Sequence, residues 1–201
     1  MNEITRKEWE EISQNTDAWT ALIDHTSTTL DLIKDEDVFF PFRPRRVIDC
    51  VGRILELVKT SIDVNAVMRI LYHAERAYVL KEEFYIIGGK PILTSHGIVI
   101  KEAIDMIEGQ HPASLIWKEY FNIEKGNVST IKRPSGGSLS TYIDDLLNTK
   151  VKEYQEDRLN DDVPESIPFA IGDIVPLSAL AKTFDQSALV ASAKREIYYS
   201  I

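Results

Sequence analysis

The sequence predicts a mainly α-helical fold: a compact multi-helix domain with one or two small β-hairpins and an N-terminal helical extension. Two observations support this fold class. Apolar residues recur at helical spacing along most of the chain, and short connectors separate the resulting segments. Strands and helices do not alternate in the way that builds a doubly wound sheet, so that class is not expected.

Two amphipathic segments open the predicted main domain. Along residues 44–60 the apolar side chains share one face of a helix and the charged side chains take the other. Residues 64–82 carry a similar stripe, and Asp63 stands where an N-cap residue accepts hydrogen bonds from the first turn. We therefore expect two consecutive helices over these ranges.

Three further helices are expected along the chain, over 98–108, 111–121 and 139–155. Gly109 suits the left-handed position that ends the first of them, and Pro112 suits the first turn of the second. Ser138 or Ser140 is placed to cap the third.

Two hairpins are expected between these helices. In FYIIGGKPIL, residues 84–93, short β-prone runs flank Gly88-Gly89, which is a turn signal. A second small hairpin is expected around Gly126, within NIEKGNVSTIKRP. Both would be minor elements of the helical domain.

The chain divides into three predicted regions. Residues 1–38 are expected to form a helical extension, because an interrupted apolar stripe runs over 5–33. Residues 39–155 form the main domain. Residues 156–201 begin as a linker rich in acidic residues and proline, and then hold two short helices packed on the main domain, over about 176–184 and 186–199.

Composition limits the compartment and the kind of partner. The chain of 201 residues contains one cysteine, which excludes a disulfide framework and a cysteine-cluster metal site. We expect a cytoplasmic location without membrane contact, since no apolar run reaches the ~18 residues of a membrane span and no signal peptide is present. The formal net charge of −9 argues against broad nucleic-acid binding, although Arg43, Arg45 and Arg46 form a local basic cluster.

Glu75 interrupts the apolar stripe of the second helix. It follows Leu71 by four positions and precedes Tyr78 by three, so it shares their face. A buried carboxylate costs several kcal/mol unless it is paired or hydrogen-bonded. We expect an ion pair or hydrogen bonds from backbone N–H groups of a loop. A catalytic acid or base with a raised pKa, or an anchor for a protein partner, are the alternatives.

The sequence contains no strong catalytic or cofactor-binding signature. The four histidines, His25, His73, His96 and His111, show no pair at helical ligand spacing, and neither HExxH nor GxSxG occurs. The glycine pairs do not match a phosphate-binding loop. Cys50 lies at the edge of an apolar helix face, where a small buried thiol is the usual state. We predict no catalytic residue, no metal and no cofactor.

Three short motifs follow one another along the main domain: RILYHAER (69–76), GGKPI (88–92) and SHGIV (95–99). In this order they resemble the Panacea domain, a family that includes SocA-like and phage-associated proteins. RPRRVIDCVGRILELV looks like the first helix of that family, and SLSTYIDDLLNTKVKEY is similar to a later one. Two positions depart from the family pattern: Ile98 stands where proline is usual, and His73 replaces an apolar residue.

The resemblance implies an antitoxin, a helical protein that neutralises a partner toxin by direct protein contact, with presentation of the toxin to a protease as a further expectation. It also implies a structural motif of Glu75, Arg76, His96 and Gly97. His96-Gly97 would open the helix expected over 98–108, with Gly97 permitting a tight turn. His96 would then form a local hydrogen bond or contact Glu75.

Four side chains are candidates for partner binding. Trp9 and Trp19 on the extension could be anchors, since tryptophan is enriched at binding hot spots; packing on the main domain is the alternative. Arg69 and His73 are expected, with Arg76, on the side of the second helix opposite its apolar stripe.

Two other functions stay open beside the antitoxin. The first is a phage-related adaptor or regulator that acts on a host protease or defence protein. The second is a small hydrolase or metal enzyme that uses His96, Glu75 and His73. The antitoxin and the adaptor both require a protein partner. The enzyme requires an open site that gathers these side chains.

Overall fold

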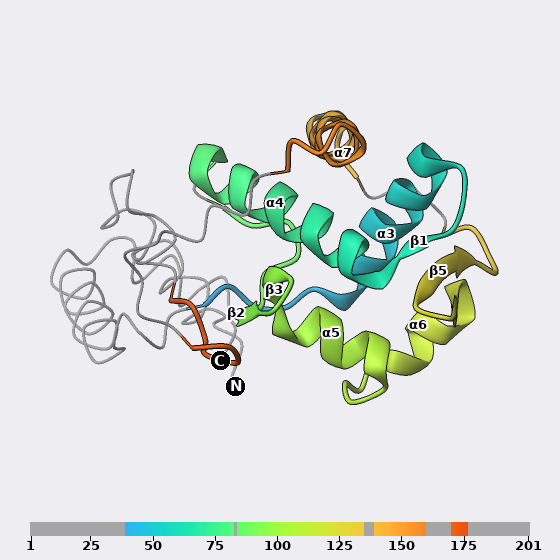
Figure 1. The fold of residues 1–201 in the computed structure, drawn as a ribbon, viewed down its shortest axis with the longest axis horizontal. Coiled ribbons are helices and arrows are strands. Elements are labelled where there is room, and N and C mark those ends of the chain that lie inside the picture. Colours follow the sequence, from blue (N-terminus) through green and yellow to red (C-terminus); the bar gives the residue numbers. More distant parts are fainter. Residues whose placement is uncertain (1–38, 83, 135–138, 160–169, 177–201) are drawn as a thin grey trace, which may run out of the picture.

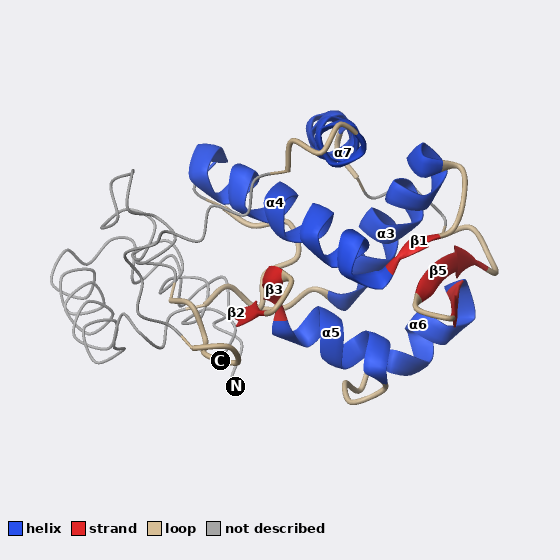
Figure 2. Cartoon of the chain, viewed as in Figure 1, coloured by secondary structure: helices blue, strands red, loops and turns tan. Residues whose placement is uncertain are grey.

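The structure, a computed structural model, describes residues 39–82, 84–134, 139–159 and 170–176 (Figure 1). Helices and small antiparallel sheets make up this part of the chain, as the sequence predicts (Figure 2). Along the sequence the elements are α3 (Pro44–Val58), β1 (Ile62–Asp63), α4 (Val64–Glu82), β2 (Pro91–Thr94), β3 (Gly97–Ile100), α5 (Lys101–Glu108), α6 (Ser114–Tyr120), β4 (Phe121–Glu124), β5 (Asn127–Thr130) and α7 (Thr141–Gln155).

The three longest of these helices, α3, α4 and α7, surround much of the core. α7 packs against both α3 and α4 (Figure 1). Each contributes fully buried aliphatic side chains, among them Ile54, Ile70 and Leu147. Burial of one such side chain contributes roughly 1.5–3 kcal/mol, so the amphipathic pattern of these segments accounts for their packing.

Capping residues set several helix ends. The Asp63 carboxylate accepts a hydrogen bond from the N–H of Asn65 at 2.8 Å, and the Ser140 hydroxyl accepts one from the N–H of Ile143 at 3.3 Å. Gly109 ends α5 in the left-handed conformation, with φ 85°. These three predicted caps are confirmed.

The first sheet has the strand order β1-β5-β4. β4 and β5 form a tight antiparallel hairpin whose two turn residues, Lys125 and Gly126, have φ of 51° and 81°. Positive φ at both positions is typical of the type I′ turn, one of the two common two-residue hairpin turns. The hairpin expected around Gly126 is therefore confirmed.

The second sheet is a hairpin whose turn lies closer to the C-terminus than predicted. β2 and β3 pair across Ser95-His96, whereas Gly88-Gly89 is not the turn of a hairpin. Residues 97–100 pair with β2 instead of forming the first turn of a helix. α5 therefore begins at Lys101, and the expectation of a helix from residue 98 is wrong.

Residues 170–176, which we call the strap, lie along the outer edge of β2. Val175 of the strap and Leu159 both join the hydrophobic core. Of the region 156–201, the described residues thus reach the core of the main domain, whereas the two short helices expected to pack there lie outside the described residues.

Several predicted elements cannot be compared with the structure. The extension over 1–38 lies outside the described residues, as do the helices expected over 176–184 and 186–199 apart from position 176. Among the helices that are described, none combines the length and the apolarity needed to cross a membrane.

Candidate functional site

The carboxylate of Glu75 lies in the core on α4, and only 6% of the residue is exposed. Its Oε2 accepts hydrogen bonds from the N–H groups of Ile86 at 3.0 Å and Ile87 at 2.9 Å, and its Oε1 accepts one from Gly88 at 3.0 Å. A loop supplies all three donors. The expectation that backbone N–H groups of a loop satisfy Glu75 is confirmed.

The loop held by this carboxylate, residues 84–89, is the anchored loop. It also fixes the chain that leads into α3. The N–H of Arg43 donates to the carbonyl of Ile87 at 2.7 Å, and the N–H of Gly89 donates to the carbonyl of Phe40 at 2.8 Å. One side chain of α4 therefore controls the position of a loop and, through it, the start of another helix.

Burial raises the pKa of Glu75 above that of an ordinary glutamate. Desolvation of the charged form is the largest effect, and the three backbone N–H groups and Arg43 oppose it. The hydrogen bonds that the described residues make to this carboxylate all come from backbone N–H groups. Both oxygens are thus engaged in holding the backbone, and Glu75 lines neither of the two clefts described below.

The predicted contact between Glu75 and His96 does not form. His96 is exposed at the β2–β3 turn, where its backbone N–H donates to the Thr94 hydroxyl at 3.1 Å. Gly97 follows with φ 107° and begins β3. His96 therefore belongs to a hairpin turn and Gly97 to the strand after it. The pair does not open a helix, because the apolar residues after it pair with β2.

Two adjacent substitutions at this turn are expected to have different effects. His96→Ala should change the free energy of unfolding by less than about 0.5 kcal/mol, because the imidazole is exposed. Gly97→Ala should lower it by about 1–3 kcal/mol, because φ 107° is strained for any residue with a Cβ. Urea unfolding followed by circular dichroism measures both, and equal losses would contradict this description of the turn.

The three sequence motifs meet in the structure. Glu75 of RILYHAER accepts a hydrogen bond from Gly88 of GGKPI. GGKPI in turn pairs with SHGIV, with Ile92 opposite Val99 in the β2–β3 hairpin. The residues that carry the family resemblance therefore form one contiguous unit.

The other predicted residues of α4 are less exposed than expected. His73 is buried, with its ring 5.5 Å from that of Tyr72, so its placement on an open face is wrong. Arg69 and Arg76 are half-buried. The guanidinium of Arg69 donates to the carbonyl of Leu159 at 3.0 Å, which shows that the chain after α7 covers this side of the helix.

A cleft of about 760 Å³ brings Arg69 and His96 together. The β2–β3 turn, the first turns of α4 and the end of α7 form its walls, and Asp63, Asn65 and Tyr154 also line it. The other two predicted partner-binding residues, Trp9 and Trp19, lie outside the described residues, and their role stays a prediction.

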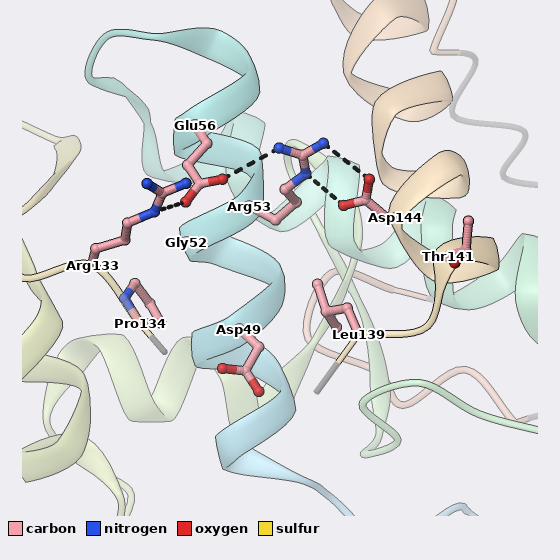
Figure 3. A pocket seen from close by; sticks show the side chains of 9 residues that line it. All are labelled: Asp49, Gly52, Arg53, Glu56, Arg133, Pro134, Leu139, Thr141 and Asp144. Atoms are coloured by element: carbon pink, nitrogen blue, oxygen red, sulfur yellow. Dashed lines mark hydrogen bonds and ion pairs between the residues drawn. The ribbon is translucent and has the colours of Figure 1, made fainter. Parts of the chain in front are cut away.

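A second cleft, of about 600 Å³, lies between α3, α7 and the chain near Pro134 (Figure 3). Arg53 binds Asp144 with two hydrogen bonds, of 2.5 and 3.0 Å. It also contacts Glu56 at 3.3 Å, and Glu56 pairs with Arg133. The hydrogen bond from Arg133 is the main cause that lowers the pKa of Glu56. These charges form a chain of ion pairs that joins three segments.

The second cleft was not predicted from the sequence. Arg53 and Asp144 lie 91 positions apart, and each charge alone is typical of an exposed helix face. One signal was available, since Gly52 interrupts a strongly amphipathic helix. A Cβ at Gly52 would lie 2.6 Å from Cγ of Pro134, so this glycine lets the chain after β5 approach α3.

Paired charges and hydrogen-bonding groups line these clefts. Across residues 39–82, 84–134, 139–159 and 170–176, no three histidine, cysteine, aspartate or glutamate side chains gather to hold a metal ion. Cys50 is buried, and this burial, with the charges of Glu75 and Asp49, raises the pKa of its thiol. Such a thiol is poorly placed to act as a nucleophile.

Comparison with known proteins does not add a relative to these observations. No family model matches the chain, and neither a curated protein nor a solved structure shows significant similarity to it. The resemblance to the Panacea domain therefore stays a prediction that rests on the three motifs and their order.

Proposed function

We propose that the chain is an antitoxin that binds a protein toxin directly and neutralises it by covering part of its surface. The proposal rests chiefly on four large aliphatic side chains that are exposed on neighbouring elements: Leu115 and Ile116 of α6, Ile123 of β4, and Ile131 just after β5. We call them the docking face. Leu115 is 74% exposed and Ile131 is 61% exposed.

α6 and the β4–β5 hairpin give the docking face a firm support. The buried rings of Trp117 and Phe121 pack with their centroids 4.7 Å apart. The N–H of Ile131 donates to the carbonyl of Tyr120 at 2.8 Å, which joins the end of β5 to the end of α6. Figure 1 shows both elements at the end of the molecule remote from the strap. Exposed aliphatic side chains on neighbouring elements are candidate contacts for a protein partner.

Two further observations support an antitoxin. The three motifs that resemble the Panacea domain contact one another through Glu75, Gly88 and the β2–β3 pairing. The net charge of −9 suits a basic protein partner.

The alternative of a hydrolase or metal enzyme loses the arrangement on which it depended. Glu75 is buried and bound by the anchored loop, while His96 is exposed on a turn, so the two do not form a site. The adaptor alternative, like the antitoxin, requires a protein partner and differs in what that partner does.

Co-expression with the product of the adjacent gene tests the proposal. We expect that product to arrest growth when expressed alone, and the chain to restore growth and to co-purify with it. Leu115→Glu/Ile131→Glu should reduce the co-purified amount at least tenfold, because each substitution puts a charge on the docking face. Thr149→Glu/Gln155→Glu is the matched control, since it adds the same two charges to exposed positions of α7.

Three results would count against the proposal. If the neighbouring product is harmless alone, or does not co-purify, it is not a toxin that this chain neutralises by binding. Full rescue of growth by Leu115→Glu/Ile131→Glu would show that the toxin does not bind at the docking face. A partner that binds but is not toxic favours the adaptor instead.

A further inference from the structure

The outer edge of β2 is already occupied by the strap, a segment of its own chain. The strap runs antiparallel to β2, and Ile174 lies opposite Ile92. The three hydrogen bonds between them run from the N–H of Leu93 to the carbonyl of Asp173 (3.0 Å), from the N–H of Gly172 to the carbonyl of Leu93 (2.8 Å), and from the N–H of Val175 to the carbonyl of Pro91 (2.8 Å). Proline has no N–H, so the outward-facing groups of Pro91 and Leu93 are all paired.

A single side chain anchors the strap. Val175 is 1% exposed and belongs to the hydrophobic core. Beside it, Ile174 lies opposite Ile92 of β2, which lies opposite Val99 of β3, so an aliphatic row crosses the strap and the two strands. A sheet edge whose main-chain groups bind an added segment, beside a pocket for an aliphatic side chain, is an arrangement by which proteins bind extended peptides.

Within the described part of the chain, the strap has few contacts for its length. Three hydrogen bonds to β2 and one buried side chain order seven residues there, and the lost backbone freedom of those residues opposes docking. Ile171 is 71% exposed, and Ile174 is exposed as well. Segments with so little burial open at a lower free energy than the whole fold.

We propose that the outer edge of β2 is a strand-acceptor site for extended peptides with a β-branched aliphatic residue at the position of Val175. The strap is the resident occupant, and a partner segment with this pattern binds when the strap is released. The inference rests on the proposed function only for the source of that segment. The site itself belongs to β2 and lies remote from the docking face (Figure 1).

A labelled synthetic peptide of residues 168–177, PFAIGDIVPL, tests the site on the full-length chain by fluorescence anisotropy. Ile92→Cys/Ile174→Cys places two thiols directly opposite each other, within reach of a disulfide that locks the strap in place. The reduced form of the same protein is the matched control. We expect the peptide to bind the oxidised form at least tenfold more weakly than the reduced form.

Two further measurements sharpen this test. Val175→Asp in the full chain should bind the peptide at least tenfold more tightly than the wild type, whereas a peptide with the same substitution should not bind. If Val175→Asp does not fold, hydrogen exchange of the wild type decides. The amides of Gly172 and Val175 should then exchange at least tenfold faster than that of Val99.

Equal peptide affinity for the oxidised and reduced forms, or no binding to either, would overturn the strand-acceptor site. Equal protection of the strap and of Val99 would overturn its reversible docking. Peptide binding together with failed rescue of growth would keep this site and reject the antitoxin, so the two proposals fail separately.

Discussion

Replacement of Glu75 by alanine is expected to lower the free energy of unfolding by about 3 kcal/mol or more. The substitution removes the acceptor of three buried backbone N–H groups that now lie 2.9–3.0 Å from the carboxylate. Each buried donor left without a partner costs about 1–3 kcal/mol. Because natural domains are stable by only about 5–15 kcal/mol, one change of this size takes a large share of the total.

Urea unfolding at neutral pH, followed by circular dichroism, measures this loss. Glu82→Ala is the matched control, since Glu82 is exposed at the end of the same helix and should shift stability by less than about 0.5 kcal/mol. Glu75→Gln keeps one acceptor oxygen and should fall between the two. Similar unfolding midpoints for Glu75→Ala and Glu82→Ala would mean that the carboxylate does not hold the loop.

Gly88→Ala is expected to cause a comparable loss, of about 3 kcal/mol, by obstructing the path of the anchored loop. Gly88 adopts φ 63°, and a Cβ there would lie 2.1 Å from the carbonyl oxygen of Pro41. The obstacle is backbone, which cannot rotate away as a side chain can. Either the loop or the chain before α3 must move, and the hydrogen bond from Gly88 to Glu75 is then disturbed.

Gly109→Ala separates crowding from backbone strain. Gly109 also has a positive φ, of 85°, but apart from its own chain neighbours no atom of the described residues lies within 4 Å of the Cβ that it would acquire. Only the conformational strain remains, which costs about 1 kcal/mol. Thermal unfolding of both variants side by side measures the difference, and equal shifts in Tm would show that the approach to Pro41 is unimportant.

The elements with strong local signals could be predicted from the sequence. α3, α4 and α7 carry apolar stripes, and Asp63, Ser140 and Gly109 stand at the boundaries where such residues cap helices. The β4–β5 hairpin follows from a turn that needs positive φ. In each case the interactions that decide the structure lie within a few residues of one another.

The β2–β3 hairpin was misplaced because Gly88-Gly89 is a stronger turn signal than Ser95-His96. These glycines meet a different need: they carry positive φ where the loop approaches the backbone near Pro41. The approaching segment is distant in sequence, so local patterns cannot show whether a glycine pair makes a hairpin or makes room.

The candidate site could be predicted only in outline. A carboxylate on an apolar stripe must have a partner, so the environment of Glu75 was foreseeable, but the loop that supplies the donors depends on tertiary packing. The burial of His73 and the contact of Arg69 with Leu159 depend on the path of the chain after α7. The sequence of α4 alone therefore predicts neither the burial of His73 nor the contact of Arg69.

Glu75 binds main-chain N–H groups, which every residue except proline possesses. Its hold on the anchored loop therefore constrains the course of the main chain far more than the identity of Ile86 or Ile87, which other apolar residues of similar size could replace. Over evolutionary time, relatives of this chain should retain the glutamate and the glycine at position 88 while the intervening stretch drifts. Such relatives could repack the core beneath the anchored loop while the path of its main chain stays the same.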